Sequence, residues 1–176
     1  MDATAIAALV EESAKKSGLL WVRASGRHHR AHPMWQVWHD GAIYVLTGGI
    51  EQPAPEGLTD RAFVTLRSKD KNSRLLTIEA DVGVVEPDTD EWAAVVPLLL
   101  AKRLNLPDAE QASERWRREC VIYRLRANGE VVETPDEPTT SSHAAVPPPT
   151  AAKTRVPRPL HLRGRPRRSR GWRSGA

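Results

Sequence analysis

The stretch 32–49, HPMWQVWHDGAIYVLTGG, constrains the fold of this chain more than any other. Two apolar runs, 33–38 and 42–46, flank Asp40-Gly41, and an Asp-Gly pair between such runs is a strong local signal for a β-hairpin. The second run ends at Thr47-Gly48-Gly49, where glycine allows the backbone to approach a ligand closely. The stretch therefore predicts a hairpin that is either plain β architecture or one wall of a cofactor cleft.

Further strands are predicted from short apolar segments bounded by turn residues, at 19–24, 63–66, 75–85 and 121–126. In 75–85, apolar residues alternate with polar ones, which is typical of a strand with one buried face. Asn128-Gly129 predicts a turn after the last strand.

Three segments have the 3.6-residue spacing of helices, namely 2–17, the segment from about 90 to Lys102, and 108–118. Asp2 or Thr4 can cap the first helix, and Thr89 or Asp90 can cap the second. Antiparallel strands joined by short turns favour a small barrel, and neither G-x-G-x-x-G nor G-K-[ST] is present as a nucleotide-binding fingerprint.

Charge divides the chain into two parts. Nine of the 26 Lys and Arg residues and none of the 22 acidic residues lie beyond residue 137. The tail therefore carries +9, whereas residues 1–137 carry 17 basic against 22 acidic groups. Eight of the 14 prolines lie beyond Thr134, so we predict a domain at 1–133 and a disordered Pro- and Arg-rich tail at 134–176.

Cysteine and histidine usage argues against disulfides and metals. Cys120 is the only cysteine, which excludes an internal disulfide and favours a buried, inert thiol. His28, His29 and His32 lie close in sequence, but adjacent strand residues point to opposite faces and no nearby Cys completes a site, so we predict no metal. The polar N-terminus does not resemble a signal peptide, and the longest apolar stretch, 93–101, is far shorter than the ~20 residues of a membrane span. We expect a cytoplasmic protein without a membrane segment.

The order of elements resembles the pyridoxamine 5'-phosphate oxidase-like, FMN-binding split-barrel family. The resemblance covers residues 19–125 and rests on four features: Arg30 and Pro33 at the start of the second strand, the aromatic-rich hairpin 35–47 ending in a hydroxyl, the long alternating strand 74–85, and the terminal Arg124-Leu125. It implies a mostly β fold, a split β-barrel of about six antiparallel strands with flanking helices. It also implies a homodimer with the flavin in the groove between subunits.

The resemblance implies cofactor contacts from the second strand, from the end of the third strand and from the loop that follows. That loop reads Glu51-Gln52-Pro53, where many family members place cations against the phosphate. Arg67, Lys69 and Arg74 offer compensating charge or form a solvated hairpin tip. The predicted cofactor-binding residues are Arg30, Pro33, Met34, Tyr44, Thr47, Gly48, Gln52, Arg67, Lys69 and Arg74.

The functional expectation follows from the resemblance. It is an oxidoreductase that uses FMN, or a deazaflavin coenzyme, on a small-molecule substrate, with no catalytic residue identified. The alternatives are a non-catalytic dimeric flavin-binding or regulatory protein of the same fold, and a protein without a cofactor. Trp21, Trp35 and Trp38 fit core or interface packing as well as stacking on a flavin ring. The arginine-rich segment 163–173 can contact nucleic acid or remain solvated without a partner.

Overall fold

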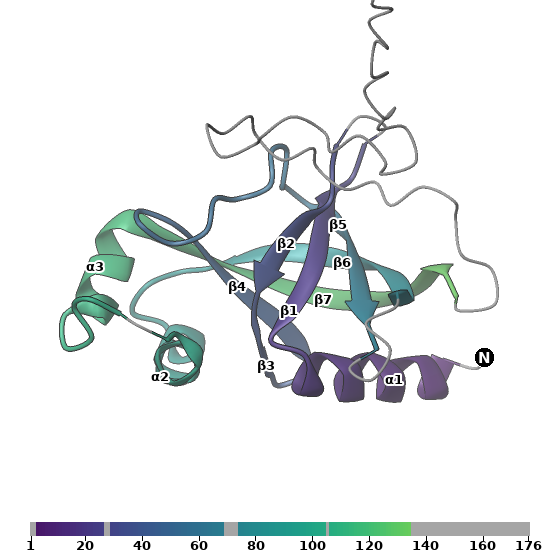
Figure 1. Ribbon diagram of the computed structural model, residues 1–176, viewed down its shortest axis with the longest axis horizontal. Helices are drawn as coiled ribbons and strands as arrows, with labels where there is room; N and C mark the ends of the chain where they lie inside the picture. The colour runs from purple at the N-terminus through teal and green to yellow at the C-terminus, as the bar shows by residue number, and fades with distance from the viewer. Residues whose placement is uncertain (1–2, 27–28, 69–73, 105, 135–176) are drawn as a thin grey trace, which may run out of the picture. The chain divides into compact units, whose positions relative to one another are not determined.

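The computed structural model describes residues 3–26, 29–68, 74–104 and 106–134, all within one compact unit, Met1–Ala145. Within these residues, seven strands form one sheet flanked by three helices (Figure 1). The elements in chain order are α1 (Ala3–Lys16), β1 (Leu19–Ala24), β2 (His32–Trp35), β3 (Val37–His39), β4 (Ala42–Gly48), β5 (Arg61–Arg67), β6 (Arg74–Val85), α2 (Asp90–Lys102), α3 (Ala112–Glu119) and β7 (Cys120–Glu133). No helix in the described part of the chain is both long and apolar enough to cross a membrane.

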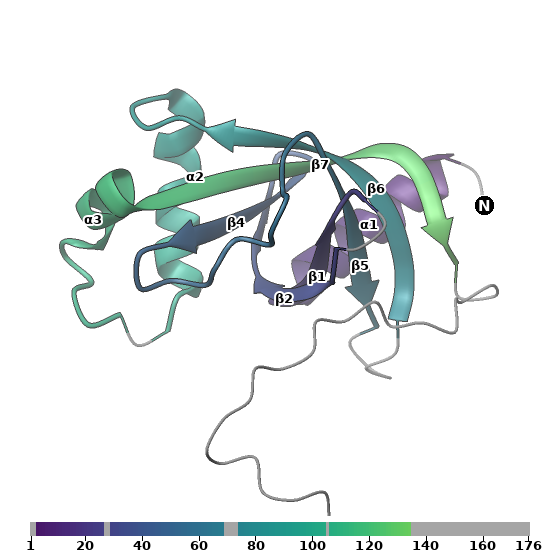
Figure 2. The same cartoon turned by 90° about the horizontal axis from the view of Figure 1, so that it is seen from above.

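The sheet is antiparallel throughout, with its strands in the order β2, β1, β5, β6, β7, β4, β3. Its two edge strands, β2 and β3, are consecutive in the chain and only Gln36 separates them. A single segment therefore supplies both edges, and the sheet curls into a half-barrel (Figures 1 and 2). The predicted mostly β, antiparallel split-barrel fold is confirmed. The predicted boundary at 133–134 falls at the end of the described residues, and the predicted disorder of the tail concerns residues outside them, so both stay predictions.

The turn of the predicted hairpin and its second strand are confirmed, but the prediction of its first strand is wrong. Asp40 and Gly41 both have positive φ, 42° and 71°, which is the type I′ turn that joins β3 to β4. The run 33–38, however, is not one strand, because it breaks at the buried residue Gln36. The Gln36 side chain donates to the carbonyls of Ala14 and Ser17 at the end of α1, which holds the chain in a corner.

β4 is buried on both faces, since six consecutive residues from Ala42 to Thr47 are buried. One face lies in the inner core, to which α1 contributes Val10 and Ala14. The other face lies in the outer core, which α2 and α3 cover with Trp92, Val95, Leu99 and Trp116 among other residues. β4 and the helices that follow β6 are therefore packed together, and this packing positions the site described below.

The predicted helix at 108–118 begins later, at Ala112. The preceding residues form a turn in which the Gln111 N–H donates to the Asp108 carbonyl at 2.8 Å. The Asp108 carboxylate bonds to Arg115 instead of capping the helix. This contact between the turn at Asp108 and Arg115 on α3 accounts for the shorter helix.

The last strand is longer than predicted, because Asn128-Gly129 does not end it. β7 continues to Glu133, and its register against β6 shifts around these residues. Asn128 accepts a hydrogen bond from the Glu130 N–H at 3.0 Å, and Gly129 has a φ of 93°. The local turn signal therefore forms a bulge inside a strand. The other predicted elements are confirmed as helices and strands, including α2 with Thr89 as its N-cap, which accepts from the Trp92 N–H. The single buried face predicted for 75–85 is wrong, because Thr77 and Glu79 are buried and Val84 is exposed.

Candidate functional site

The candidate site lies where β4 ends at Gly48. Gly48 and Gly49 have φ values of 98° and 55°, in the left-handed region that favours glycine. A Cβ on Gly48 would lie 2.8 Å from the Glu119 carbonyl oxygen, so β4 passes the junction of α3 and β7 at close range. The Glu51 N–H donates to the Gly48 carbonyl at 2.9 Å, which forms a tight turn. The backbone of this exposed turn is accessible to a ligand at Gly49.

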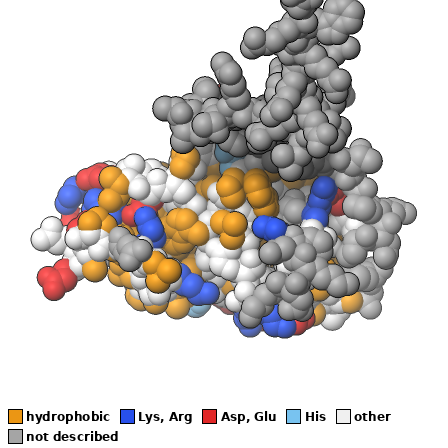
Figure 3. Space-filling model, viewed as in Figure 1, with side chains coloured by type: hydrophobic (Ala, Val, Ile, Leu, Met, Phe, Trp, Pro, Cys, Tyr) orange, Lys and Arg blue, Asp and Glu red, His pale blue; other side chains and the backbone are white. Residues whose placement is uncertain are grey.

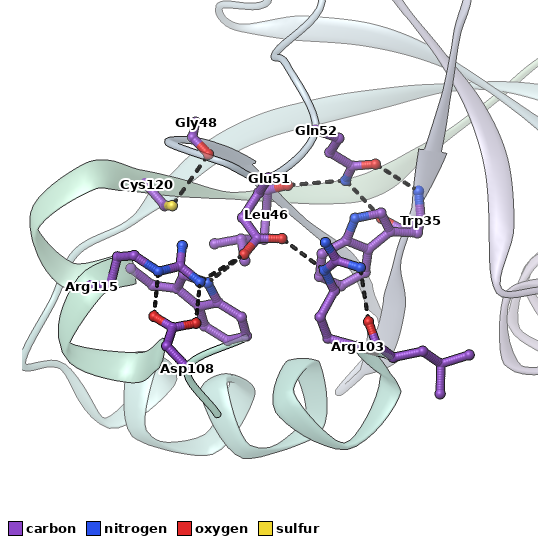
Figure 4. Close-up of polar contacts among 11 residues, drawn as sticks. Trp35, Leu46, Gly48, Glu51, Gln52, Arg103, Asp108, Arg115 and Cys120 are labelled. Atoms are coloured by element: carbon purple, nitrogen blue, oxygen red, sulfur yellow. Dashed lines mark hydrogen bonds and ion pairs between the residues drawn. The ribbon is translucent and has the colours of Figure 1, made fainter. Parts of the chain in front are cut away.

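Glu51 turns inward from this loop and is the centre of a buried ion cluster (Figure 4). We use "Glu51 cluster" for Glu51, Arg103, Asp108, Arg115 and Trp116. The Glu51 carboxylate accepts from Arg103 Nε at 2.8 Å, Arg115 Nη2 at 3.2 Å and Trp116 Nε1 at 2.9 Å. Asp108 in turn holds Arg115 through two hydrogen bonds, at 2.7 and 3.0 Å. The two formal positive charges of the cluster are thus balanced by two carboxylates.

The surroundings of Glu51 favour its ionised form. Burial alone would raise the pKa of Glu51, but the hydrogen bonds from Arg103, Trp116 and Arg115 outweigh it and place the pKa below 4.5. The loop after β4 therefore carries a permanent internal anion at neutral pH. Its partners, two arginines, come from segments far away in the sequence.

Acid should remove the contribution of Glu51 to stability. Because its folded pKa lies below the unfolded value, the ionised carboxylate stabilises the fold above pH 4.5, and this stabilisation is lost as the pH falls through the folded pKa. We expect Glu51→Gln to lower the free energy of unfolding by about 2 kcal/mol at neutral pH, and the difference from wild type to shrink below pH 4.5. Urea unfolding at a series of pH values measures this, and a difference that does not depend on pH would contradict it.

The Gln52 side chain links β2 and β4 by hydrogen bonds beside the Glu51 cluster. Its side-chain oxygen accepts from the Trp35 N–H at 2.9 Å, and its amide nitrogen donates to the carbonyls of Trp35 and Leu46, each at 3.0 Å. The Arg103 guanidinium lies 5.7 Å from the centre of the Trp35 ring. Gln52, predicted as a cofactor contact, thus holds the half-buried Trp35 beside Arg103 (Figure 4).

Of the other residues predicted to contact a cofactor, some side chains are exposed to solvent and others are buried. Arg30 and Pro33 are exposed, whereas Met34 belongs to the inner core. Tyr44 belongs to the outer core, and its hydroxyl donates to Glu91 at 2.8 Å. Burial, and then the hydrogen bond and charge of Glu91, raise the pKa of Tyr44 to about 12.

The Thr47 hydroxyl is likewise directed at protein, since it donates to the Val121 carbonyl at 3.3 Å. The side chains of Met34, Tyr44 and Thr47 are therefore all engaged within the protein. The Gly48 backbone is also engaged, because its N–H donates to the Gln52 carbonyl at 3.1 Å and its carbonyl accepts from the Glu51 N–H. The predicted cofactor contacts of these four residues stay predictions.

The predicted phosphate contacts lie elsewhere. Arg67 and Arg74 lie opposite each other in the register of β5 and β6. Arg74 Nη1 forms an ion pair with the Glu133 carboxylate at 2.6 Å. Arg67 ends β5 and Arg74 begins β6, whereas the part of β6 close to Thr47 is its other end, at Val85. β6 is 12 residues long, which corresponds to at most roughly 36 Å along a straight strand. The structure therefore does not bring Arg67 and Arg74 to Thr47 and Gly48 within one chain, and Lys69 lies outside the described residues.

The Cys120 thiol and the His29 ring are half-buried and contact neighbouring protein atoms. Burial, followed by the charge of Glu51, raises the pKa of Cys120, which disfavours the reactive thiolate. Its Sγ donates to the Gly48 carbonyl at 3.4 Å. The His29 ring lies so close to Gly26 and Gly57 that a Cβ on either would approach it within 2.7 and 2.5 Å. In the described ranges, no group of three His, Cys, Asp or Glu side chains is placed to hold a metal, and His28 lies outside them.

No family model and no curated protein matches this chain. Among solved structures, it is similar to a heme storage protein of Vibrio cholerae, with 14% identity over 69% of this chain and 89% of the other and a TM-score of 0.49. It is similar to an FAD-binding protein of Mesorhizobium loti, with 10% identity over 69% and 87% and a TM-score of 0.47. A third, from Clostridium acetobutylicum, is described as belonging to the pyridoxinephosphate oxidase family and has 12% identity over 78% and 99% with a TM-score of 0.41.

Proposed function

We propose that this chain is a split-barrel protein that binds FMN or a deazaflavin coenzyme at the end of β4. The observation that carries the proposal is the loop after β4, in which Gly49 is exposed and Gln52 holds the half-buried Trp35 beside the Arg103 guanidinium. A planar, phosphate-bearing cofactor needs a close backbone approach, an aromatic neighbour and a cation. These are the groups that the end of β4 offers.

The residues fit the ring of such a cofactor better than its phosphate. Trp35 is fixed by Gln52, and Gly49 is exposed on the same loop. Arg103 and Arg115, in contrast, are neutralised by Glu51 and Asp108. When bound, the flavin or deazaflavin supplies two-electron redox chemistry, while the chain binds and orients it. Hydride transfer needs no acid or base from the protein, so the proposed oxidoreductase activity requires none of the carboxylates here.

A second chain could bring the predicted phosphate-binding arginines close to the predicted ring-binding residues at the end of β4. Since Arg67 and Arg74 lie far from Thr47 along β6, a homodimer offers a way to bring these arginines to the end of β4. Ile50 and Leu104 are 60% and 75% exposed, and they adjoin the Glu51–Arg103 ion pair. Apolar side chains also gather on the face seen in Figure 3, between Lys and Arg side chains. Such exposed apolar groups favour association, and we therefore propose a homodimer.

An absorption spectrum of freshly purified protein tests the proposal. We expect the spectrum of a bound flavin or deazaflavin, or its appearance on titration with the cofactor, and a dimeric mass by light scattering. Reoxidation of the reduced cofactor that depends on an added small molecule would support the oxidoreductase. Binding without such turnover would favour the non-catalytic alternative. The ion pairs of Arg103 and Arg115 with Glu51 also favour that alternative. A colourless protein that binds neither cofactor would overturn the proposal. Contact of 163–173 with nucleic acid lies outside the described residues and stays a prediction.

A further inference from the structure

Three donors from separate parts of the chain converge on one carboxylate. Arg103 follows the end of α2, and Arg115 and Trp116 lie on α3, yet all three reach Glu51 within 3.2 Å. The Glu51 side chain is fully buried, with 0% exposure. Two guanidinium groups and an indole N–H around one point form a typical anion-binding arrangement. What occupies it in this structure is a carboxylate of the same chain.

Arg115 has hydrogen-bonding capacity that Glu51 does not use. Its Nε and Nη2 are held by Asp108, and Nη2 also reaches Glu51. Its Nη1 is buried and has no hydrogen-bond partner among the described residues. An unpaired buried donor is costly, about 1–3 kcal/mol. An anion with more oxygens than a carboxylate can satisfy Nη1 while Asp108 keeps its own two bonds.

Arg103 gives solvent access to the cluster. Its side chain is 30% exposed, against 11% for Arg115, and its Nη1 donates to the Leu104 carbonyl at 3.1 Å. Glu51 itself is carried by a loop in which Gly49 and Ile50 are exposed. Gln52 is anchored separately to Trp35 and Leu46, so Glu51 can withdraw without releasing the strands.

We propose that Arg103, Arg115 and Trp116 form a receptor for a phosphate group, that Glu51 fills this receptor in the ligand-free chain, and that phosphate competes with Glu51 for it. A phosphate dianion carries more charge and more acceptor oxygens than the carboxylate, which suits two arginines with a donor to spare. The loop after β4 then acts as an internal competitor that weakens the binding of phosphate-bearing ligands. The receptor does not rest on the proposed flavin, because inorganic phosphate alone probes it.

Removing the competitor should strengthen phosphate binding. We expect Glu51→Ala to bind inorganic phosphate at least tenfold more tightly than the wild-type chain, as measured by the rise in Tm with phosphate at constant ionic strength, with chloride as the reference salt. Glu56→Ala removes an exposed carboxylate from the same loop and should behave as wild type. Glu51→Ala combined with Arg103→Ala should lose the gain. If the folded Glu51→Ala chain binds phosphate within twofold of wild type, the receptor is refuted.

Two further measurements decide the matter if Glu51→Ala does not fold. Glu51→Gln keeps the volume of the side chain and should show a gain in the same direction. In the full-length wild type, inorganic phosphate should shift the Trp116 indole N–H resonance saturably in a ¹⁵N NMR spectrum and leave that of Trp38 in place. An unshifted Trp116 resonance at high phosphate would overturn the proposal whatever the variants do.

Discussion

Replacing Trp116 by alanine is expected to lower the free energy of unfolding by about 3–5 kcal/mol. Trp116 is fully buried in the outer core, where α3 packs against β4 and β7. The substitution leaves a large cavity and also removes the indole N–H that donates to Glu51 at 2.9 Å. Urea unfolding followed by far-UV circular dichroism measures the loss, because that signal does not depend on the removed indole.

Trp116→Phe is the matched control for this prediction. Phenylalanine keeps most of the ring volume but cannot donate to Glu51, so the expected loss is smaller, about 1–2 kcal/mol. The difference between the two variants separates packing from the hydrogen bond. If Trp116→Ala costs less than about 1 kcal/mol, α3 does not pack on the sheet as described.

Gly48→Ala is expected to be the most damaging substitution at the end of β4. Its φ of 98° is strained for any residue with a side chain, and the new Cβ would lie 2.8 Å from the Glu119 carbonyl and 3.3 Å from the Cys120 Cα. Both contacts are backbone atoms at the junction of α3 and β7, so neither can rotate away. Strain and overpacking together should cost about 2–5 kcal/mol, measured as a shift of the urea midpoint.

Gly41→Ala separates the two causes. Gly41 also has a positive φ, 71°, but a Cβ added there would meet no atom of the described residues within 4 Å, apart from its own chain neighbours. Only backbone strain remains, at about 1 kcal/mol. Equal losses for Gly41→Ala and Gly48→Ala would mean that the close approach of β4 to the α3–β7 junction is not present in solution.

Most of the fold could be predicted because local patterns decide it. Asp40-Gly41 specifies a turn by its own backbone preferences, and the alternation along 75–85 specifies β6. The break at Gln36 could not be predicted, since its cause is a hydrogen bond to Ala14, 22 residues earlier in the chain. The extension of β7 past Asn128-Gly129 depends on pairing with β6, which outweighs the local turn signal.

The candidate site was predictable only in part. Thr47-Gly48-Gly49 predicts a close approach of the backbone to a ligand. The structure shows a close approach of Gly48 to the backbone of Glu119 and Cys120, and the approach to a ligand stays a prediction. The sequence also indicates that Glu51 is a poor partner for a phosphate. It does not indicate that Glu51 neutralises arginines 52 and 64 residues away, because an ion pair between distant elements leaves no periodic pattern. Arg103, Arg115 and Trp116 were therefore missed as parts of the site.

The most direct test of the central claim is a titration of FMN and of the deazaflavin coenzyme against three full-length chains, followed by cofactor fluorescence. The chains are the wild type, Trp35→Leu and Trp38→Leu, two variants that each lose a half-buried tryptophan. Trp35, the last residue of β2, lies beside Arg103 near the loop that follows β4. Trp38 lines a separate cavity with Ala14 and Leu98. We predict saturable binding of one cofactor that weakens at least tenfold in Trp35→Leu and stays within twofold of wild type in Trp38→Leu. Absence of saturable binding by the wild type, or equal binding by Trp35→Leu, would contradict a cofactor site at the end of β4.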